Sequence, residues 1–143
     1  MSTIHHQVSI NASAARVYHA VATADGISTW WDKQTPIHTD GGLVFEHNPG
    51  PEHGAVQLRV VTSIPDKRVE FECISHHPPS SPASVWTGTH FVFELSQDGD
   101  TTTLDFRQTG YDEQSPFFAA NNAAWKDLLQ HLKQVVESQG LGA

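Results

Sequence analysis

Residues 115–139 are SPFFAANNAAWKDLLQHLKQVVESQ, the longest helical pattern in the chain. Mostly apolar side chains recur here at spacings of three and four residues, which is typical of a helix that buries one face. At 1.5 Å per residue such a helix would be roughly 35 Å long, enough to lie across a whole antiparallel sheet, and Gly140 is its expected stop. We therefore predict a long amphipathic C-terminal helix that covers a sheet. The residues that follow this spacing are Phe117, Asn121, Ala124, Trp125, Leu128, Leu129, Leu132, Val135 and Val136.

The strands that this helix would cover lie upstream of it. Asp98-Gly99 separates two alternating segments, and this dipeptide is typical of a tight hairpin. Because the connections are short, we expect an antiparallel sheet with one dry face and one wet face. Alternation of apolar and polar residues predicts strands at residues 4–10, 43–46, 56–61, 68–74, 91–95 and 102–108.

Two short helices are predicted between the first and second of these strands. Ser13 can cap a helix over residues 14–21, and residues 27–31 follow as a second helix that carries Trp30 and Trp31. Adjacent side chains on a helix diverge, so the two rings cannot both face inward. We expect one to pack into the core and the other to shelter a loop. The alternative is that one of them lines the mouth of a pocket.

Composition limits the class of protein. The chain has 143 residues, with 16 acidic against 8 basic side chains and a formal charge of −8 at pH 7, and this length fits a single domain over residues 1–143. Such a surface is a poor partner for nucleic acid or an anionic membrane, since both are bound through Lys and Arg. No apolar run approaches the roughly 20 residues of a membrane span, and the first residues lack a signal-peptide pattern. We therefore expect a cytoplasmic protein that binds no nucleic acid and has no membrane span.

Neither a metal site nor a cofactor site is predicted. Cys73 is the only cysteine, which excludes an intramolecular disulfide and a thiolate zinc cluster. The ten histidines include two adjacent pairs, His5-His6 and His76-His77. Neighbours on a strand point to opposite faces, so each pair offers one ligand per face. The sequence has no nucleophile elbow and no phosphate-binding loop, and we assign no catalytic residue and no cofactor.

The order of elements resembles the helix-grip fold of the START-like (SRPBCC) superfamily. This is an α+β fold in which a curved antiparallel sheet of six or seven strands wraps around a long C-terminal helix, with two short helices after the first strand. Several stretches resemble the family of homologues of the activator of heat-shock protein 90 ATPase, namely residues 10–20, 27–31, 41–42, 65–69, 109–111 and 122–129. The sequence departs from this family at residues 71–74, which lack an aromatic-Trp pair, and at the proline-rich residues 76–84.

The resemblance implies a cavity between sheet and helix that takes an apolar or amphipathic small molecule. From the parity of the strands, His6, His47, Cys73 and Gln108 share the inward face and are candidate polar groups. For most of the inward residues the alternative is that they only fill a core. The predicted cavity residues are Trp31, Phe45, His47, Leu58, Phe71, Cys73, Phe91, Phe93, Phe106, Gln108, Trp125 and Leu129.

Three functions remain open, because the superfamily includes lipid carriers, polyketide cyclases and chaperone partners and the fold alone does not choose among them. The leading hypothesis is a small-molecule binding module that holds a hydrophobic or amphipathic ligand without a cofactor. The second is a cyclase-, dehydratase- or isomerase-type enzyme with His6 and His47 as acid–base candidates and Gln108 as an orienting group. The third, implied by the resemblance, is a protein that interacts with a chaperone. The sequence specifies no oligomeric state and is compatible with a homodimer.

Overall fold

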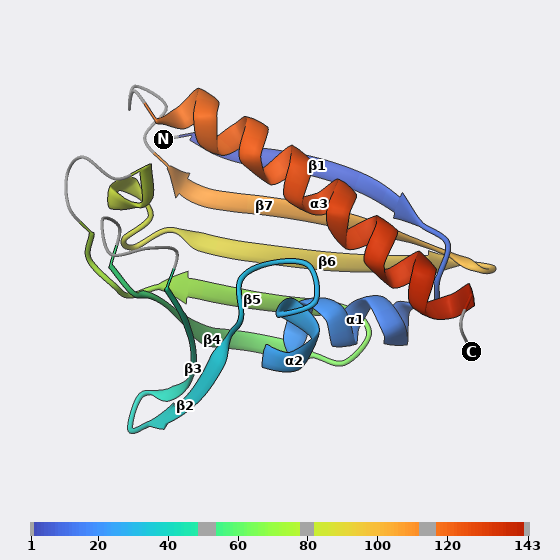
Figure 1. Cartoon of the computed structure of the whole chain (residues 1–143), viewed down its shortest axis with the longest axis horizontal. Coiled ribbons are helices and arrows are strands. Elements are labelled where there is room, and N and C mark those ends of the chain that lie inside the picture. Colours follow the sequence, from blue (N-terminus) through green and yellow to red (C-terminus); the bar gives the residue numbers. More distant parts are fainter. Residues whose placement is uncertain (1, 49–53, 78–81, 112–116, 142–143) are drawn as a thin grey trace.

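The structure is a computed structural model that describes residues 2–48, 54–77, 82–111 and 117–141. Within these ranges, seven antiparallel strands form one sheet in the order β1-β7-β6-β5-β4-β3-β2, and α3 lies diagonally across it (Figure 1). The strands are β1 (Ser2–Ile10), β2 (Thr35–Thr39), β3 (Gly42–His47), β4 (Val56–Ile64), β5 (Arg68–Cys73), β6 (His90–Asp98) and β7 (Thr101–Tyr111). The helices are α1 (Ala14–Ala22), α2 (Ala24–Ile27), the short 3-10 helix η1 (Pro82–Val85) and α3 (Phe118–Leu141).

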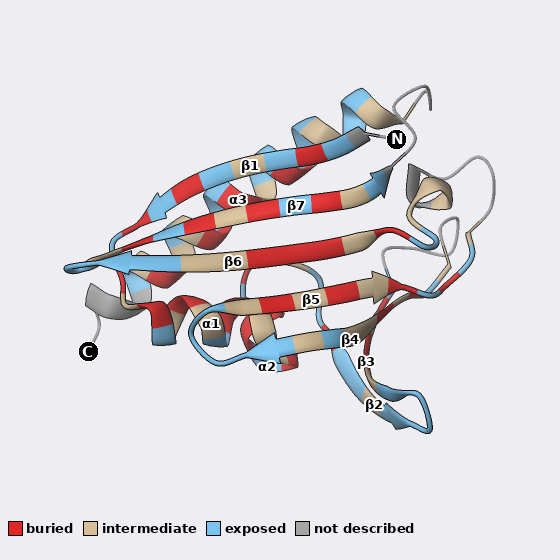
Figure 2. Cartoon of the chain, turned by 180° about the vertical axis from the view of Figure 1, so that it is seen from behind, coloured by how far each residue is buried: buried red, intermediate tan, exposed pale blue. Residues whose placement is uncertain are grey.

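The three α-helices lie on the same face of the sheet (Figures 1 and 2). Buried residues alternate with more exposed ones along β1, β7 and β5, as Figure 2 shows, because successive strand side chains point to opposite faces, whereas three successive residues of β6 are buried. The predicted α+β helix-grip fold, with one dry face under a long C-terminal helix, is confirmed. Among the described residues, none of the helices has the length and apolar character needed to cross a membrane.

The wet face of the sheet carries charged pairs between neighbouring strands. Glu70 accepts hydrogen bonds from Arg68 at 2.8 Å and from the His90 ring at 2.6 Å. Partial burial raises the pKa of Glu70, but these hydrogen bonds outweigh that effect and hold the pKa below its ordinary value. Between β1 and β7, the His5 ring donates to the Asp105 carboxylate at 2.8 Å. Strand parity therefore places these charged pairs on the wet face of the sheet, as the alternation predicts.

The first helix begins where the sequence predicts it. The Ser13 hydroxyl accepts from the backbone N–H of Arg16 at 3.3 Å, as expected of an N-cap. The prediction of a second helix over residues 27–31 is wrong, because α2 ends at Ile27. The hydroxyls of Ser28 and Thr29 bond back to helix carbonyls at 2.7 and 2.6 Å. Such bonds compete with further helix, and residues 28–30 form a turn instead.

This turn changes the placement of the two tryptophans. Trp30 is 2% exposed, and its Nε1 donates to the carbonyl of Ala20 at 2.7 Å. Trp31 is half-buried, and the centroid of its ring lies 5.1 Å from that of Trp125 on α3. Both rings therefore contact the interior. The expectation that only one could face inward rests on a helix that does not form.

Two further features depart from the sequence prediction. β2 was not predicted, because this strand at the edge of the sheet is mostly exposed and has no apolar face that alternation could reveal. The prediction that Gly140 stops the last helix is wrong, since α3 continues to Leu141; one glycine lowers helix propensity by only about 1 kcal/mol relative to alanine. Part of the proline-rich stretch 76–84 and the predicted helix start at residues 115–116 lie outside the described residues.

Candidate functional site

A cluster of aromatic rings fills the space between the sheet and the middle of α3. Trp125 is its centre: the ring stacks on Phe106 with centroids 4.2 Å apart and meets Phe91 edge-on at 5.4 Å. We call this set of packed rings the aromatic cluster. Its members are Trp31, Trp86, Phe91, Phe93, Phe106 and Trp125.

The predicted cavity residues all lie on this side of the sheet. Apart from Trp31, which is half-buried, each of them is buried. Phe45 and Phe71 extend the rings toward β3, with centroids 5.7 Å apart, and Phe71 meets Phe93 at 6.3 Å. Leu58, Cys73 and Leu129 belong to the same hydrophobic core. Apart from Trp31, the periodicity of the strands and of the last helix therefore predicted the inward direction of these side chains.

Trp86 is a member of the aromatic cluster that the sequence reasoning missed. It follows η1, after the proline-rich stretch, where no strand or helix pattern assigns a direction to a side chain. Its ring meets Phe91 at 5.3 Å, and its Nε1 donates to Asn121 Oδ1 on α3 at 3.2 Å. The only feature of the sequence that could have pointed to Trp86 was the presence of a tryptophan in a segment rich in serine and proline.

Two polar atoms inside this region have no hydrogen-bond partner among the described residues: Gln108 Oε1 and Trp125 Nε1. Gln108 is 0% exposed and Trp125 is 1% exposed. The Gln108 amide donates from Nε2 to Thr89 Oγ1 at 3.1 Å, while the Thr89 hydroxyl donates to a carbonyl at 2.6 Å. This arrangement fixes the amide and leaves Oε1 unpaired. Since an unsatisfied buried polar atom costs about 1–3 kcal/mol, the pair is suited to a polar group of a bound molecule.

His47 forms a second polar centre at the end of β3. Its ring is 3% exposed and lies 4.6 Å from the Trp31 ring, while Nδ1 lies 3.2 Å from Gln34 Oε1. Burial lowers the pKa of His47 from 6.5 to about 4, although the Asp32 carboxylate opposes this and His77 adds to it. The imidazole is therefore neutral at neutral pH. Gln34, a buried partner thirteen positions away in sequence, was not predicted.

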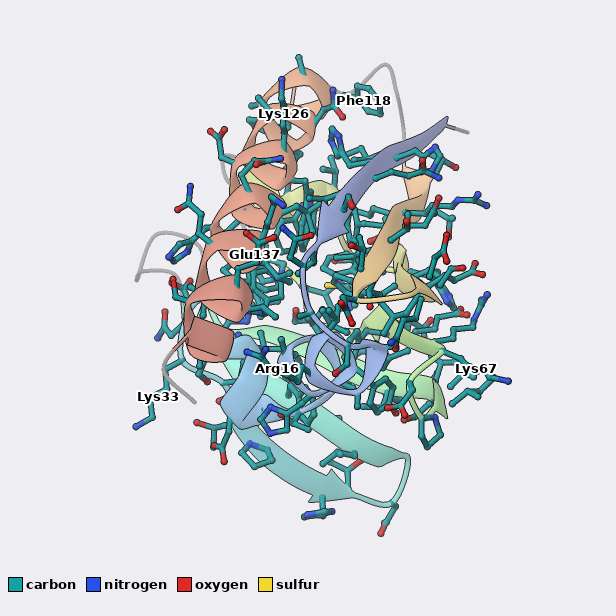
Figure 3. The ribbon with its side chains drawn as sticks, turned by 90° about the vertical axis from the view of Figure 1, so that its right-hand side faces the viewer. Arg16, Lys33, Lys67, Phe118, Lys126 and Glu137 are labelled. Atoms are coloured by element: carbon teal, nitrogen blue, oxygen red, sulfur yellow. The ribbon has the colours of Figure 1, made fainter. Side chains whose placement is uncertain are left out.

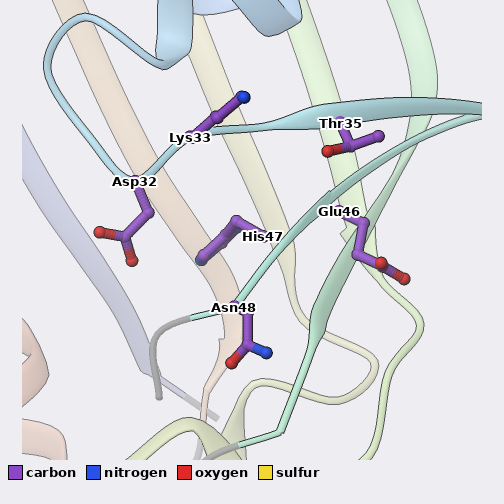
Figure 4. Close-up of a pocket in the computed structure, with 6 residues that line it drawn as sticks. All are labelled: Asp32, Lys33, Thr35, Glu46, His47 and Asn48. Carbon is purple, nitrogen blue, oxygen red and sulfur yellow. The ribbon is translucent and has the colours of Figure 1, made fainter.

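His47 lines a surface hollow of about 390 Å³ (Figure 4). We call it the His47 hollow; its lining residues are Asp32, Lys33, Thr35, Glu46, His47 and Asn48. Other hollows on the described surface include one against α3 at Val135 and one between Thr23 and Phe45. None of these three is lined by the aromatic cluster, whose rings are in contact with one another.

The other candidate polar groups have separate partners. His6 is half-buried, and its Nε2 donates to the carbonyl of Asn122 on α3 at 3.0 Å. His6 and His47 therefore bond to different elements, and β7, β6, β5 and β4 lie between their strands. The structure does not bring them together as an acid–base pair. Burial raises the pKa of the Cys73 thiol, which keeps it protonated.

The described residues contain no group of three or more His, Cys, Asp and Glu side chains placed to hold a metal ion. The adjacent histidines His5 and His6 point to opposite faces of β1, one to Asp105 and one to α3. This separation follows from strand geometry, as the sequence predicts. The charged side chains project mainly into solvent around the outside of the molecule (Figure 3).

The curved sheet, the long helix across it and the aromatic interior between them define a protein of the helix-grip, START-like class. The chain belongs to the activator of Hsp90 ATPase homolog 1-like protein family, whose sequence profile matches residues 11–137. No match to the sequence was found among curated proteins.

Solved structures share this fold. The Aha1 dimer from Colwellia psychrerythraea, determined in solution, is 27% identical, with a TM-score of 0.80 over 96% of this chain and 97% of that one. Protein MLL2253 from Mesorhizobium loti is 17% identical, with a TM-score of 0.78 over 96% and 98% of the two chains. CalU16 from Micromonospora echinospora is 16% identical, with a TM-score of 0.71 over 97% of this chain and 78% of that one.

Proposed function

We propose that this protein is a binding module that holds an amphipathic small molecule against the aromatic cluster, between the sheet and α3. The observation that carries the proposal is the pair of buried, unpaired polar atoms at the cluster, a donor on Trp125 and an acceptor on Gln108. Both side chains adjoin the same rings: Trp125 packs on Phe106 and Phe91, and Gln108 is paired with Phe91 across β6 and β7. A ligand pocket is mostly apolar with a few polar groups that fix orientation.

The two atoms indicate the chemistry of the ligand. An indole N–H can only donate, and an amide oxygen can only accept. A hydroxyl both accepts and donates, so its chemistry matches the Trp125 donor and the Gln108 acceptor. Because the rings contact one another, the ligand must displace one of them, and Trp31 and Trp86 are the half-buried members of the cluster. We therefore propose a hydroxylated aromatic or acyl compound.

The test compares a hydroxylated probe with its deoxy analogue. We expect 2-naphthol to raise the melting temperature, and to bind roughly tenfold more tightly than naphthalene, because it forms hydrogen bonds that the hydrocarbon cannot. Gln108→Leu and Trp125→Phe each remove one of the two polar partners, and each should reduce this difference while naphthalene binding is retained. Binding is measured by thermal shift and by native mass spectrometry, across a wider panel of such pairs that includes fatty alcohols.

The control variant is Leu132→Met, which changes a buried apolar side chain of α3 outside the aromatic cluster. It should leave the difference between 2-naphthol and naphthalene as in the native protein. The circular dichroism of Gln108→Leu and Trp125→Phe establishes that they are folded. The proposal fails if no member of the panel raises the melting temperature, or if both variants keep the full preference for the hydroxylated member.

The enzyme and chaperone hypotheses are supported by fewer observations than the binding module. The enzyme hypothesis lacks its acid–base pair, since His6 and His47 bond to different elements. Interaction with a chaperone rests on family membership alone and stays a prediction, as does a cytoplasmic location. The 27% identical Aha1 of Colwellia psychrerythraea is described as a dimer, which supports the prediction of a homodimer; analytical ultracentrifugation would test it.

A further inference from the structure

The orientation of the buried Gln34 amide decides which nitrogen of His47 carries a hydrogen. Gln34 Nε2 donates to the backbone carbonyl of Asp32 at 2.8 Å. A carbonyl only accepts, so the amide nitrogen must face Asp32, and the amide oxygen faces His47 Nδ1 at 3.2 Å. Because that oxygen also only accepts, Nδ1 carries the hydrogen. His47 is thereby held in the tautomer in which Nε2 bears a lone pair.

This lone pair is available to a ligand. Within the described residues, the bond to Gln34 is the one hydrogen bond of the His47 side chain. His47 lines the hollow, and its Nε2 is not among the enclosed unpaired atoms. The Nε2 atom is therefore an acceptor open to the hollow, on a ring that is otherwise buried. Trp31 supports that ring from the side of the aromatic cluster, with centroids 4.6 Å apart.

The charges around the hollow favour a cation. Asp32 and Glu46 contribute carboxylates, against the single ammonium group of Lys33 among the lining residues. Figure 4 shows the Asp32 carboxylate on the side toward which the His47 ring points, whereas the Lys33 side chain points away from both. The Glu46 carboxylate accepts from Gln57 at 2.8 Å. In Figure 4 the Glu46 side chain also points away from His47, so the charged group beside the ring is the Asp32 carboxylate, which favours a cation over an anion.

We propose that the His47 hollow binds a protonated primary amine, whose N–H groups donate to His47 Nε2 and to the Asp32 carboxylate. The ligand class is a small organic ammonium ion. This site borders on the aromatic cluster, because Trp31 contacts both His47 and Trp125, but its ligand would bind His47 and Asp32 and not the polar atoms of Gln108 and Trp125. It stands whether or not a hydroxylated compound binds beneath α3.

The first measurement is the tautomer. Long-range proton–nitrogen correlation spectra of nitrogen-15-labelled protein at pH 7 should show His47 with an unprotonated Nε2 and a protonated Nδ1. Butylammonium, 1-butanol and butyrate are then titrated into the protein. Butylammonium should shift the His47 Nε2 resonance, with an affinity roughly tenfold above that of 1-butanol, since charge-assisted hydrogen bonds are about twice as strong as neutral ones. Butyrate should leave the resonance unchanged.

Asp32→Asn keeps the shape of an exposed side chain and removes its charge, so it should weaken butylammonium binding roughly tenfold and leave 1-butanol unaffected. The matched control is Asp40→Asn, which removes an exposed carboxylate from the β2–β3 turn, outside the hollow. It should bind butylammonium as the native protein does. The proposal is overturned by a protonated Nε2, by butyrate or 1-butanol binding as tightly as butylammonium, or by equal losses in Asp32→Asn and Asp40→Asn.

Discussion

Replacing Gly26 by alanine is expected to lower the free energy of unfolding by about 3 kcal/mol or more, at the upper end of what overpacking costs. A Cβ at this position would lie 1.9 Å from the carbonyl oxygen of His19 and 2.8 Å from the Cα of Ala20. Both are backbone atoms of α1 and cannot turn aside as a flexible side chain can. The two helices would have to separate, and Trp30, which bonds to the Ala20 carbonyl, would be displaced with them.

The measurement is chemical denaturation of Gly26→Ala beside Gly41→Ala. At Gly41 a Cβ would meet only the Thr39 hydroxyl at 3.8 Å, an ordinary contact, so this control should change stability by no more than about 0.5 kcal/mol. Equal stabilities of the two variants would show that α1 and α2 are not in close contact at Gly26.

Acidification from pH 6.5 to about 4 should lower the free energy of unfolding by about 3 kcal/mol through His47 alone. The unfolded chain binds a proton near the ordinary histidine pKa of 6.5, while the folded protein does not bind it until about pH 4, because burial disfavours the charged ring. Across this window the unfolded state holds more protons, so stability falls as the pH falls. Above pH 6.5 the contribution is constant, and below about pH 4 it declines no further.

The experiment follows the free energy of unfolding against pH for the native protein, His47→Gln and His38→Gln. His47→Gln should lose the slope between pH 6.5 and 4, whatever its absolute stability. His38→Gln removes an exposed histidine of β2 and should keep the native slope. Glu70, whose pKa is held below its ordinary value, adds a loss of stability at lower pH that all three proteins share. A native slope in His47→Gln would contradict the burial of a neutral imidazole.

Most of the fold could be predicted, because its signals are local. The inward direction of Phe91, Phe106 and Gln108 follows from a strand period of two, which depends only on the backbone of that strand. The long helix follows equally from the spacing of residues such as Trp125 and Leu129. The N-cap at Ser13 needs only its own turn of helix. The prediction failed for the elements that lack such a signal. β2 has no buried face that alternation could reveal, and the expected helix over residues 27–31 gives way to a turn.

In the candidate site, too, local patterns predicted some features and tertiary contacts decided others. Periodicity alone brought Phe91, Phe93, Phe106, Trp125 and Gln108 to one face, since each strand and helix sets the direction of its own side chains. Tertiary packing decided the rest. The Trp86 ring has no local pattern to orient it, the Gln108 amide is oriented by Thr89 nineteen residues away, and the state of His47 depends on Gln34. Hydrogen bonds between distant segments fix which lone pairs remain unused, and no local pattern of residues encodes such a pairing.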